Sequence, residues 1–182
     1  MPGEPRQGGW SLAQRLLHWS TAVLVVAGFV IGLYMIGVPM RELLLKFVLF
    51  QVHKSFGLLV LLMVIARLSL RISRGRPAPV PAPRWQTLAA DAGHCALYGL
   101  LIVVPALGYL VASSSPIRIP TLFLGVIRLP DVTGANRALF DAVAPLHRWL
   151  AILLVTLAGG HAIMAAYHQV RDGVTLRRMW RA

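Results

Sequence analysis

The sequence is poor in cysteine and in acidic residues. Its single cysteine, Cys95, excludes a disulfide within the chain and a metal site made of cysteines alone. Only six of its 182 residues are Asp or Glu, against 18 Lys and Arg. Any metal chemistry must therefore rest on other ligands.

Charged residues of either sign are also scarce, which excludes an ordinary soluble domain. They make up 13% of the chain, whereas hydrophobic residues make up 57% and the mean hydropathy is +0.69. The formal net charge of +12 resides in short segments between apolar runs, a pattern typical of membrane topology. We therefore expect an integral membrane protein in contact with lipid, with no nucleic-acid partner.

Four apolar runs are long enough to cross a bilayer as helices, for which about 20 residues suffice. They cover residues 16–38, 47–72, 89–112 and 145–168. The proline- and arginine-rich stretch Arg71–Trp85 predicts an extended connector. The loop of residues 113–144, with the apolar patch LFLGVI, is expected to lie partly on the membrane surface and to cover the end of the bundle. The sequence thus predicts an all-α, four-helix membrane bundle as a single domain, residues 1–182.

The distribution of basic residues predicts the orientation of this bundle. Four spanning segments place both termini on one side, and that side holds eleven basic residues: Arg6, Arg15, Arg67, Arg71, Arg74, Arg76, Arg84, Arg171, Arg177, Arg178 and Arg181. The other side holds seven: Arg41, Lys46, Lys54, Arg118, Arg128, Arg137 and Arg148. The positive-inside rule then places both termini in the cytoplasm. The outer side is itself basic, because only Glu42, Asp131 and Asp141 oppose its seven cations, for a net charge of +4.

Ionisable residues inside spanning segments mark functional sites by default, and the six histidines fall at two depths. The outer level holds His53 and His147, and the inner level holds His18, His94, His161 and His168. His147 and His161 are 14 residues apart, which on an α-helix leaves them within about 40° of one face and about 21 Å apart along the axis. The last segment thus offers one ligand near each surface of the membrane. Arg67 and Arg71, near the inner end of the second segment, are expected to snorkel to the interface.

Histidines on different helices at one depth indicate haem more strongly than zinc. Structural zinc sites use four ligands, whereas haem iron needs two axial ligands on opposite faces of a flat macrocycle. Depth alone leaves His18 and His94 as equal partners for His161, and leaves His168 as a third ligand or an interfacial polar group. Small residues around His161 (Gly159, Gly160, Ala162, Ala165 and Ala166) would clear space for a porphyrin or allow close helix packing. A histidine in such a helix can also act only as an interhelical hydrogen-bonding group.

Several motifs together carry a resemblance to a known family. They are LLHWS around His18, QVHKSFG around His53, AGHCALYGLLIVVPALG around His94, and LHRWLA followed by GGHAIMAAYH in the last segment; MVIARLSLR and LRRMW also fit. The chain resembles the bacterial cytochrome b561 family of four-helix, di-haem membrane proteins. It looks most like its stand-alone members, which oxidise superoxide and reduce ubiquinone.

The resemblance implies specific haem ligands in a bacterial inner-membrane, multi-pass protein. His53 and His147 would ligate the outer haem b, and His18 and His161 the inner one. The remaining two histidines, at positions 94 and 168, match family residues that are not axial ligands, which implies a role at a quinone, in proton relay or at a haem propionate on the cytoplasmic side.

The resemblance also implies an oxidoreductase that takes electrons from superoxide at the periplasmic face and reduces ubiquinone. Lys54 and Arg148 directly follow the outer ligands and would steer the anion or, preferably, pair with haem propionates. The alternative is an electron-transfer subunit that links a periplasmic or other partner dehydrogenase to the quinone pool. A non-redox membrane protein with structural histidines is a third, more distant alternative.

Overall fold

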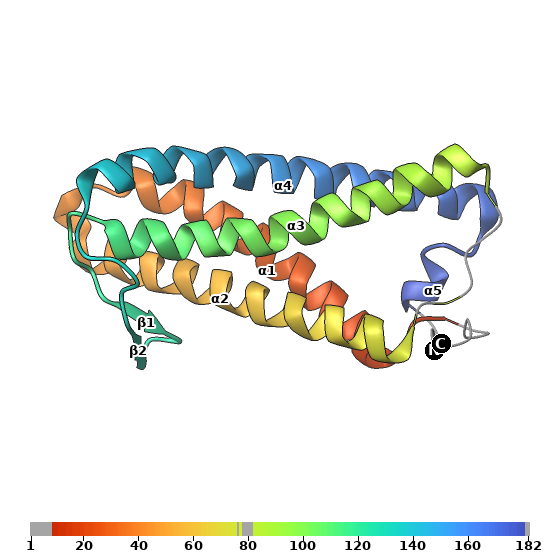
Figure 1. Ribbon diagram of the computed structural model, residues 1–182, viewed down its shortest axis with the longest axis horizontal. Coiled ribbons are helices and arrows are strands. Elements are labelled where there is room, and N and C mark those ends of the chain that lie inside the picture. The colour runs from red at the N-terminus through yellow and green to blue at the C-terminus, as the bar shows by residue number, and fades with distance from the viewer. Residues whose placement is uncertain (1–8, 76, 78–81, 181–182) are drawn as a thin grey trace.

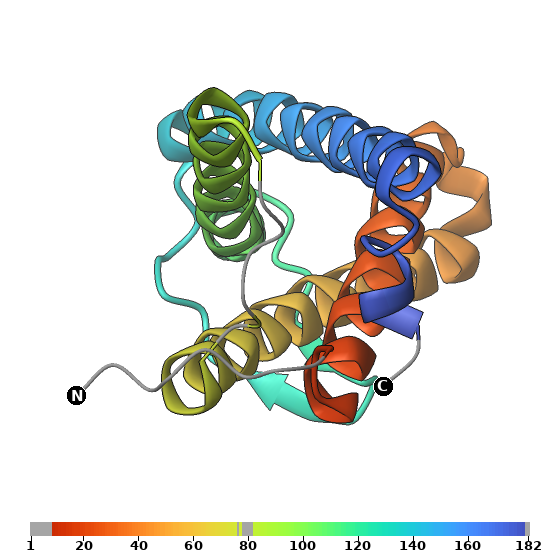
Figure 2. The same cartoon turned by 90° about the vertical axis from the view of Figure 1, so that its right-hand side faces the viewer.

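The computed structural model describes residues 9–75, 77 and 82–180, and four long helices dominate this part of the chain (Figure 1). They are α1 (Leu12–Gly37), α2 (Leu43–Arg74), α3 (Arg84–Ser114) and α4 (Arg137–Asp172). Each is long and apolar enough to cross a membrane. Seen along the bundle (Figure 2), α1 packs on α2, α3 packs on α4, and α2 also contacts α3. The predicted four-helix membrane bundle is confirmed.

Polar caps make the helices longer than the apolar runs. α1 begins after Ser11, whose Oγ accepts a bond from the Gln14 backbone N–H while the Gln14 side chain accepts one from the Ser11 N–H. α4 begins after Asn136, whose Oδ1 accepts from the Leu139 N–H at 3.0 Å. Pro145, expected at the start of the last segment, therefore lies inside a helix. A hydropathy window does not register such caps, because they precede the apolar residues.

Two short elements and a connector complete the described chain. η1 (Met40–Glu42) joins α1 to α2, and α5 (Arg177–Trp180) follows α4. α2 continues to Arg74 and α3 starts at Arg84, so the expected extended connector is shorter than predicted. Residues 76 and 78–81 of that connector lie outside the described residues.

The loop between α3 and α4 contains a hairpin that the sequence analysis did not predict. Strands β1 (Thr121–Phe123) and β2 (Ile127–Leu129) pair antiparallel beside the end of α2 (Figure 1). The loop between the strands is residues 124–126, and its first two residues, Leu124 and Gly125, have positive φ values of 53° and 78°. The apolar patch thus folds onto the bundle as strands.

Polar side chains of α2 fix the hairpin to the bundle. Gln51 donates to the Pro120 carbonyl and accepts from the Leu122 N–H, both at 2.9 Å. Ser55 accepts from the Leu124 N–H at 3.0 Å. Gln51 and Ser55 are both buried, so the strand backbone is satisfied without contact with water.

A small apolar core separates the two depths at which the histidines lie. It consists of Val60 and Val64 on α2, Leu101 and Val104 on α3, and Leu154 on α4. Leu154 is seven residues, or about two helical turns, from His147 and equally far from His161. The apolar core therefore lies between the two histidine levels.

The two ends of the described chain meet at the end of the bundle opposite the hairpin (Figure 1). The Trp10 N–H donates to the Arg178 carbonyl at 3.4 Å, and Trp19 Nε1 donates to the Met179 carbonyl at 3.3 Å. The rings of Trp19 and Trp180 lie 4.8 Å apart. We call this the terminal end, and the end carrying β1 and β2 the hairpin end. That the terminal end faces the cytoplasm stays a prediction.

Candidate functional site

Two histidines face each other in the hairpin half of the bundle. The ring centres of His53 on α2 and His147 on α4 are 6.1 Å apart, with the ring planes at 87°. If imidazole nitrogens lie about 2.0–2.1 Å from a shared metal, as in zinc sites, two rings on its opposite sides have centres roughly 6.3 Å apart. The observed separation fits two axial ligands of one metal.

Backbone carbonyls orient both rings of this pair. His53 Nδ1 lies 2.9 Å from the Gly28 carbonyl oxygen, and His147 Nδ1 lies 3.0 Å from that of Val104. A carbonyl oxygen can only accept, so each Nδ1 carries the proton. Each Nε2 then keeps its lone pair for a metal, the arrangement that metal-binding histidines usually show.

Two glycines make room for these rings. A Cβ added at Gly32 would lie 3.0 Å from His53 Cε1, and one added at Gly108 would lie 2.9 Å from His147 Cε1. Contacts this short force a neighbour to move, and here the neighbour is the candidate ligand. The close approach of α1 to His53 and of α3 to His147 thus requires the absence of a side chain at both positions.

The cavity between the pair is apolar. Apart from His53 and His147, its lining consists of hydrophobic residues and glycines, among them Leu24, Phe29, Phe56, Val60, Pro105 and Leu154. Such walls suit a flat, largely apolar macrocycle.

The terminal half contains a second histidine group, with three members. The ring centre of His161 on α4 lies 6.3 Å from that of His18 on α1 and 5.4 Å from that of His94 on α3. The first distance fits a shared metal as the hairpin-end pair does. The predicted depth of the histidines in the membrane did not decide whether His18 or His94 is the partner of His161. In the structure, both rings lie near His161.

The polar environment of His18 differs from that of the hairpin-end pair. Its Nδ1 lies 3.1 Å from Arg67 Nη2. By contrast, the Nδ1 atoms of His53 and His147 face carbonyl oxygens. A guanidinium group has donors only, so His18 Nδ1 accepts here and the ring proton lies on Nε2; ligation of a metal by Nε2 would require Arg67 to leave Nδ1. Arg67 therefore does not snorkel to the interface as expected.

Comparison with known proteins identifies the family. The family model described as prokaryotic cytochrome b561 matches residues 9–182. The chain belongs to the prokaryotic cytochrome b561 family. It is 34% identical over 166 residues to "Cytochrome b561 homolog 2" of Escherichia coli K12, covering 89% of this chain and 86% of the relative.

Two further relatives of this cytochrome are more distant. "Probable superoxide oxidase CybB" of Yersinia pestis is 29% identical over 135 residues, covering 71% of this chain and 73% of that protein. "Cytochrome b561 homolog 1" of Escherichia coli K12 is 27% identical over 173 residues, covering 93% of this chain and 96% of that protein. The family and the four spanning helices make this chain a bacterial membrane protein of electron transfer, and the family implies a b-type haem.

The histidine pairs fit such a haem better than they fit another metal site. Two ligands at the separation found here suffice for haem iron. Within residues 9–75, 77 and 82–180, no group of three or more His, Cys, Asp or Glu side chains could hold a metal ion. Which histidines of this cytochrome bind haem, and how many haems it holds, stay predictions.

The other predicted site residues lie outside the two histidine groups. The His168 ring is 5.6 Å from that of Tyr167 near the end of α4. Lys54 Nζ donates to the carbonyls of Ile119 and Pro120, at 3.1 and 3.4 Å, so it binds the segment that leads into β1. Arg148 is exposed at the hairpin end. None of the three roles predicted for His168, Lys54 and Arg148 is tested by these positions.

Sequence reasoning missed the residues that support the histidines. Gly28 and Val104 contribute only backbone carbonyls, which carry no signal of residue type. Gly32 and Gly108 do carry a signal, since a glycine within a spanning helix often marks a close approach. Small residues were sought instead around His161, where an added Cβ at Gly159 or Gly160 would meet no atom within 4 Å. Close helix packing is therefore not what these two glycines provide.

Proposed function

We propose that this cytochrome oxidises superoxide to O2 at the hairpin end and reduces ubiquinone at the terminal end, with one haem b between His53 and His147 and a second between His18 and His161. The hairpin end would face the periplasm and the terminal end the cytoplasm, following the excess of basic residues at the latter.

The observation that carries this proposal is the arrangement of two histidine pairs at two depths along α4. His147 and His161 each lie about 6 Å, ring centre to ring centre, from a histidine of another helix. Two axial histidines leave no open position on a haem iron, which suits electron transfer over ligand binding. The packed core around Leu154 keeps the two positions separate.

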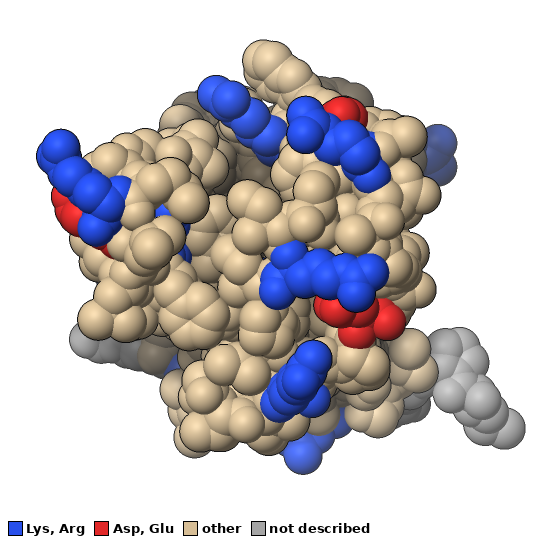
Figure 3. Space-filling model, turned by 90° about the vertical axis from the view of Figure 1, so that its left-hand side faces the viewer, with Lys and Arg blue, Asp and Glu red and all other residues tan. Residues whose placement is uncertain are grey.

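The charge of the hairpin end supports an anionic electron donor. Two of its three acids are already paired: Glu42 lies 3.9 Å from Arg41, and Asp141 lies 2.7 Å from Arg137. Lys46 and Lys54 donate to backbone carbonyls, and Figure 3 shows basic side chains spread over the face with few acidic ones. A basic surface of this kind raises the on-rate of a small anion by roughly 10 to 10³ fold.

The chain contributes binding, orientation and insulation. When bound, two haem b groups would supply the one-electron chemistry. Two superoxide anions are oxidised to two O2 molecules and give up two electrons. This step consumes no protons, so no proton donor is needed at the hairpin end. Ubiquinone takes up two electrons and two protons, and His94 or His168 would relay those protons from the cytoplasm.

A second function is supported by a different observation. The relative that is 34% identical is named only as a cytochrome b561 homolog, whereas the superoxide oxidase name belongs to a relative at 29%. The basic hairpin end could equally dock an acidic protein surface. In that case the chain would be an electron-transfer subunit that links a partner dehydrogenase to the quinone pool.

Haem reduction in the isolated chain distinguishes the two functions. We would purify the protein alone, count its b haems by the pyridine haemochrome spectrum, and follow haem reduction by superoxide with and without ubiquinone. A superoxide oxidase reduces its haems rapidly, at a rate that falls with ionic strength, and reoxidises them when ubiquinone is added. A rate no faster than that of a bis-histidine cytochrome of neutral surface, and insensitive to salt, would favour the subunit. A preparation without a haem spectrum would exclude both functions.

A further inference from the structure

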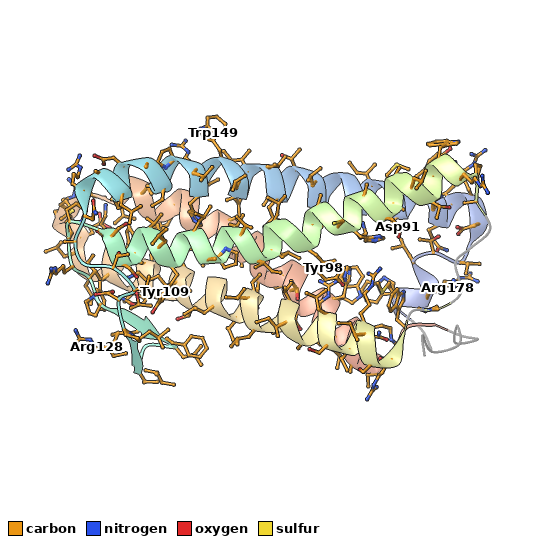
Figure 4. The ribbon with its side chains drawn as sticks, viewed as in Figure 1. Asp91, Tyr98, Tyr109, Arg128, Trp149 and Arg178 are labelled. Atoms are coloured by element: carbon orange, nitrogen blue, oxygen red, sulfur yellow. The ribbon has the colours of Figure 1, made fainter. Side chains whose placement is uncertain are left out.

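Two arginines of α2 extend into the terminal half of the bundle. The guanidinium carbons of Arg67 and Arg71, one helical turn apart, lie 5.3 and 5.7 Å from the ring centre of Tyr98 on α3. Figure 4 shows Tyr98 on the side of α3 that faces α2. Both arginines are half-buried, so they cover the ring from α2 and do not extend freely to the membrane surface.

These two cations lack a carboxylate partner in the part of the chain that the structure describes. Neither Arg67 nor Arg71 takes part in the ion pairs of Arg41 with Glu42 and of Arg137 with Asp141. The polar groups against Arg67 are instead the His18 ring and Tyr98. Arg71 contacts the same tyrosine ring.

Positive charge placed this way inside a spanning segment calls for an anion. An uncompensated charge in a bundle interior is costly, and arginines in spanning helices generally pair with another group. The guanidinium group presents five N–H donors in a rigid fork that matches a carboxylate in a bidentate manner. The bond to His18 uses one donor of Arg67 and leaves the others for a ligand.

We propose that Arg67 and Arg71 bind carboxylate groups, and that these are the propionate side chains of a haem held by His18 and His161. This inference rests on the proposed function, which assigns a haem to that pair. Proximity identifies the source of the carboxylate, because Arg67 Nη2 is only 3.1 Å from the ring of His18, a candidate ligand. Ligation by His18 Nε2 would place the ring proton on Nδ1, so Arg67 would turn from His18 to the propionate and neutralise the cofactor's charge.

The proposal makes the two haem positions electrostatically different. At the hairpin end, carbonyl oxygens of Gly28 and Val104 lie behind the ligand rings, and Lys54 is bonded to backbone carbonyls of the hairpin loop. At the terminal end, the guanidinium group of Arg67 lies beside His18, and that of Arg71 lies one helical turn further along α2, against Tyr98. Positive charge stabilises the reduced, less positively charged iron, so the removal of either arginine should lower the reduction potential of the inner haem.

Infrared spectroscopy of the full-length protein tests the carboxylate directly. Cells fed δ-aminolaevulinate labelled with ¹³C at its carboxyl carbon place the label in the haem propionates. We would record oxidised-minus-reduced infrared difference spectra and mediator-based redox titrations of the wild type, Arg67→Gln, Arg71→Gln and Arg67→Lys. Arg171→Gln is the matched control, because Arg171 is an exposed cation at the same end that bonds only Tyr167.

We expect both glutamine variants to shift the labelled carboxylate bands that accompany inner-haem reduction. At a fixed potential, the ratio of reduced to oxidised inner haem should fall about tenfold, which corresponds to about 59 mV. Arg67→Lys should retain most of the wild-type ratio, and Arg171→Gln should change neither readout.

Labelled bands that are unchanged in Arg71→Gln would overturn the proposal, even where Arg67→Gln loses the inner haem. A shift confined to unlabelled carboxylate bands would also overturn it, because the arginines would then hold another anion such as a lipid. Neither measurement uses superoxide. The proposal that superoxide is the electron donor can therefore be refuted without refuting the propionate site, and the propionate site can be refuted without refuting that proposal.

Discussion

At the scale of single residues, the backbone selects the state of the hairpin-end histidines. The carbonyls of Gly28 and Val104 each accept a bond from Nδ1, which leaves Nε2 of His53 and His147 available for a metal. Bonds from such groups behind a ligand orient the ring and raise its basicity. His18 at the terminal end differs, because a guanidinium group and not a carbonyl oxygen lies against its Nδ1.

The first prediction concerns Gly108. Gly108→Ala places a Cβ 2.9 Å from His147 Cε1, so the ring must move and the outer haem should be lost or bind weakly. The pyridine haemochrome count should fall from two toward one haem per chain. Gly99→Ala on the same helix is the matched control, because its Cβ would meet no atom within 4 Å. This control should keep both haems and gain up to about 1 kcal/mol of stability. Full haem content in Gly108→Ala would refute the close-approach argument.

The second prediction separates the two haem sites. His147→Ala should remove only the outer haem and His161→Ala only the inner one, since each residue lies in a different half of the bundle. Absorption spectra at low temperature, combined with a haem count, distinguish one missing haem from two. His168→Ala, whose ring lies beside Tyr167, should retain both haems. If either ligand variant lost both haems, the assignment of separate pairs would be unsupported.

His94 needs its own comparison, because it lies closer to His161 than His18 does. His18→Ala should remove the inner haem, whereas His94→Ala should retain it and slow its reoxidation by ubiquinone. Stopped-flow measurement of haem reoxidation gives this readout. If His94→Ala lost the inner haem and His18→Ala retained it, His94 would be the axial ligand and His18 would not.

At the scale of elements, hydropathy predicted the four helices but not what joins them. Each spanning run was found because about 20 apolar residues in succession have few other interpretations. The hairpin was missed because its strands have three residues each and its turn carries one glycine, Gly125. Its stability comes from Gln51 and Ser55 on α2, about 70 residues earlier in the chain. No local pattern encodes such a contact.

The same contrast holds for the candidate site. Composition and spacing identified the histidines and grouped them by depth, and the structure brings members of each level together. Gly32 and Gly108 became interpretable only once the helices that they face were known. Arg67 was expected at the interface because a long basic side chain near a helix end usually reaches water. Its actual neighbours belong to α1 and α3, which sequence order does not reveal.

A third prediction concerns the attachment of the hairpin to α2. Gln51→Ala removes two hydrogen bonds and leaves the Leu122 N–H and the Pro120 carbonyl without this partner, at a cost of about 1–3 kcal/mol. Hydrogen exchange of the hairpin amides should accelerate, while exchange at the centre of the helices should not change. Ser69→Ala is the control on the same helix, since Ser69 is exposed and bonds only within α2. Equal exchange in Gln51→Ala and wild type would show that the hairpin is held by its apolar contacts.

At the scale of the whole molecule, the apolar core and the charge distribution act together. The core around Leu154 lies between two polar sites along one bundle, and Figure 3 shows the basic residues at the hairpin end. Cations at the terminal end follow from membrane topology. If the hairpin end faces the periplasm, as proposed, its cations oppose the topology rule and call for a functional reason.

The fourth prediction tests that reason by removing charge from one end at a time. The double variant Arg118→Gln/Arg128→Gln neutralises two exposed cations near the hairpin, which should lower the rate constant of haem reduction by superoxide about tenfold at low ionic strength. At an ionic strength of about 1 M, where the Debye length is about 3 Å, the variant and the wild type should converge. Arg171→Gln/Arg177→Gln removes the same charge from the terminal end and should leave the rate unchanged. Stopped-flow haem reduction over a salt series gives all three values. If both double variants lowered the rate constant equally, the net charge would matter and its placement would not. If the hairpin-end variant did not lower the rate constant, the basic surface would not serve to attract superoxide, which would favour the docking of a protein partner.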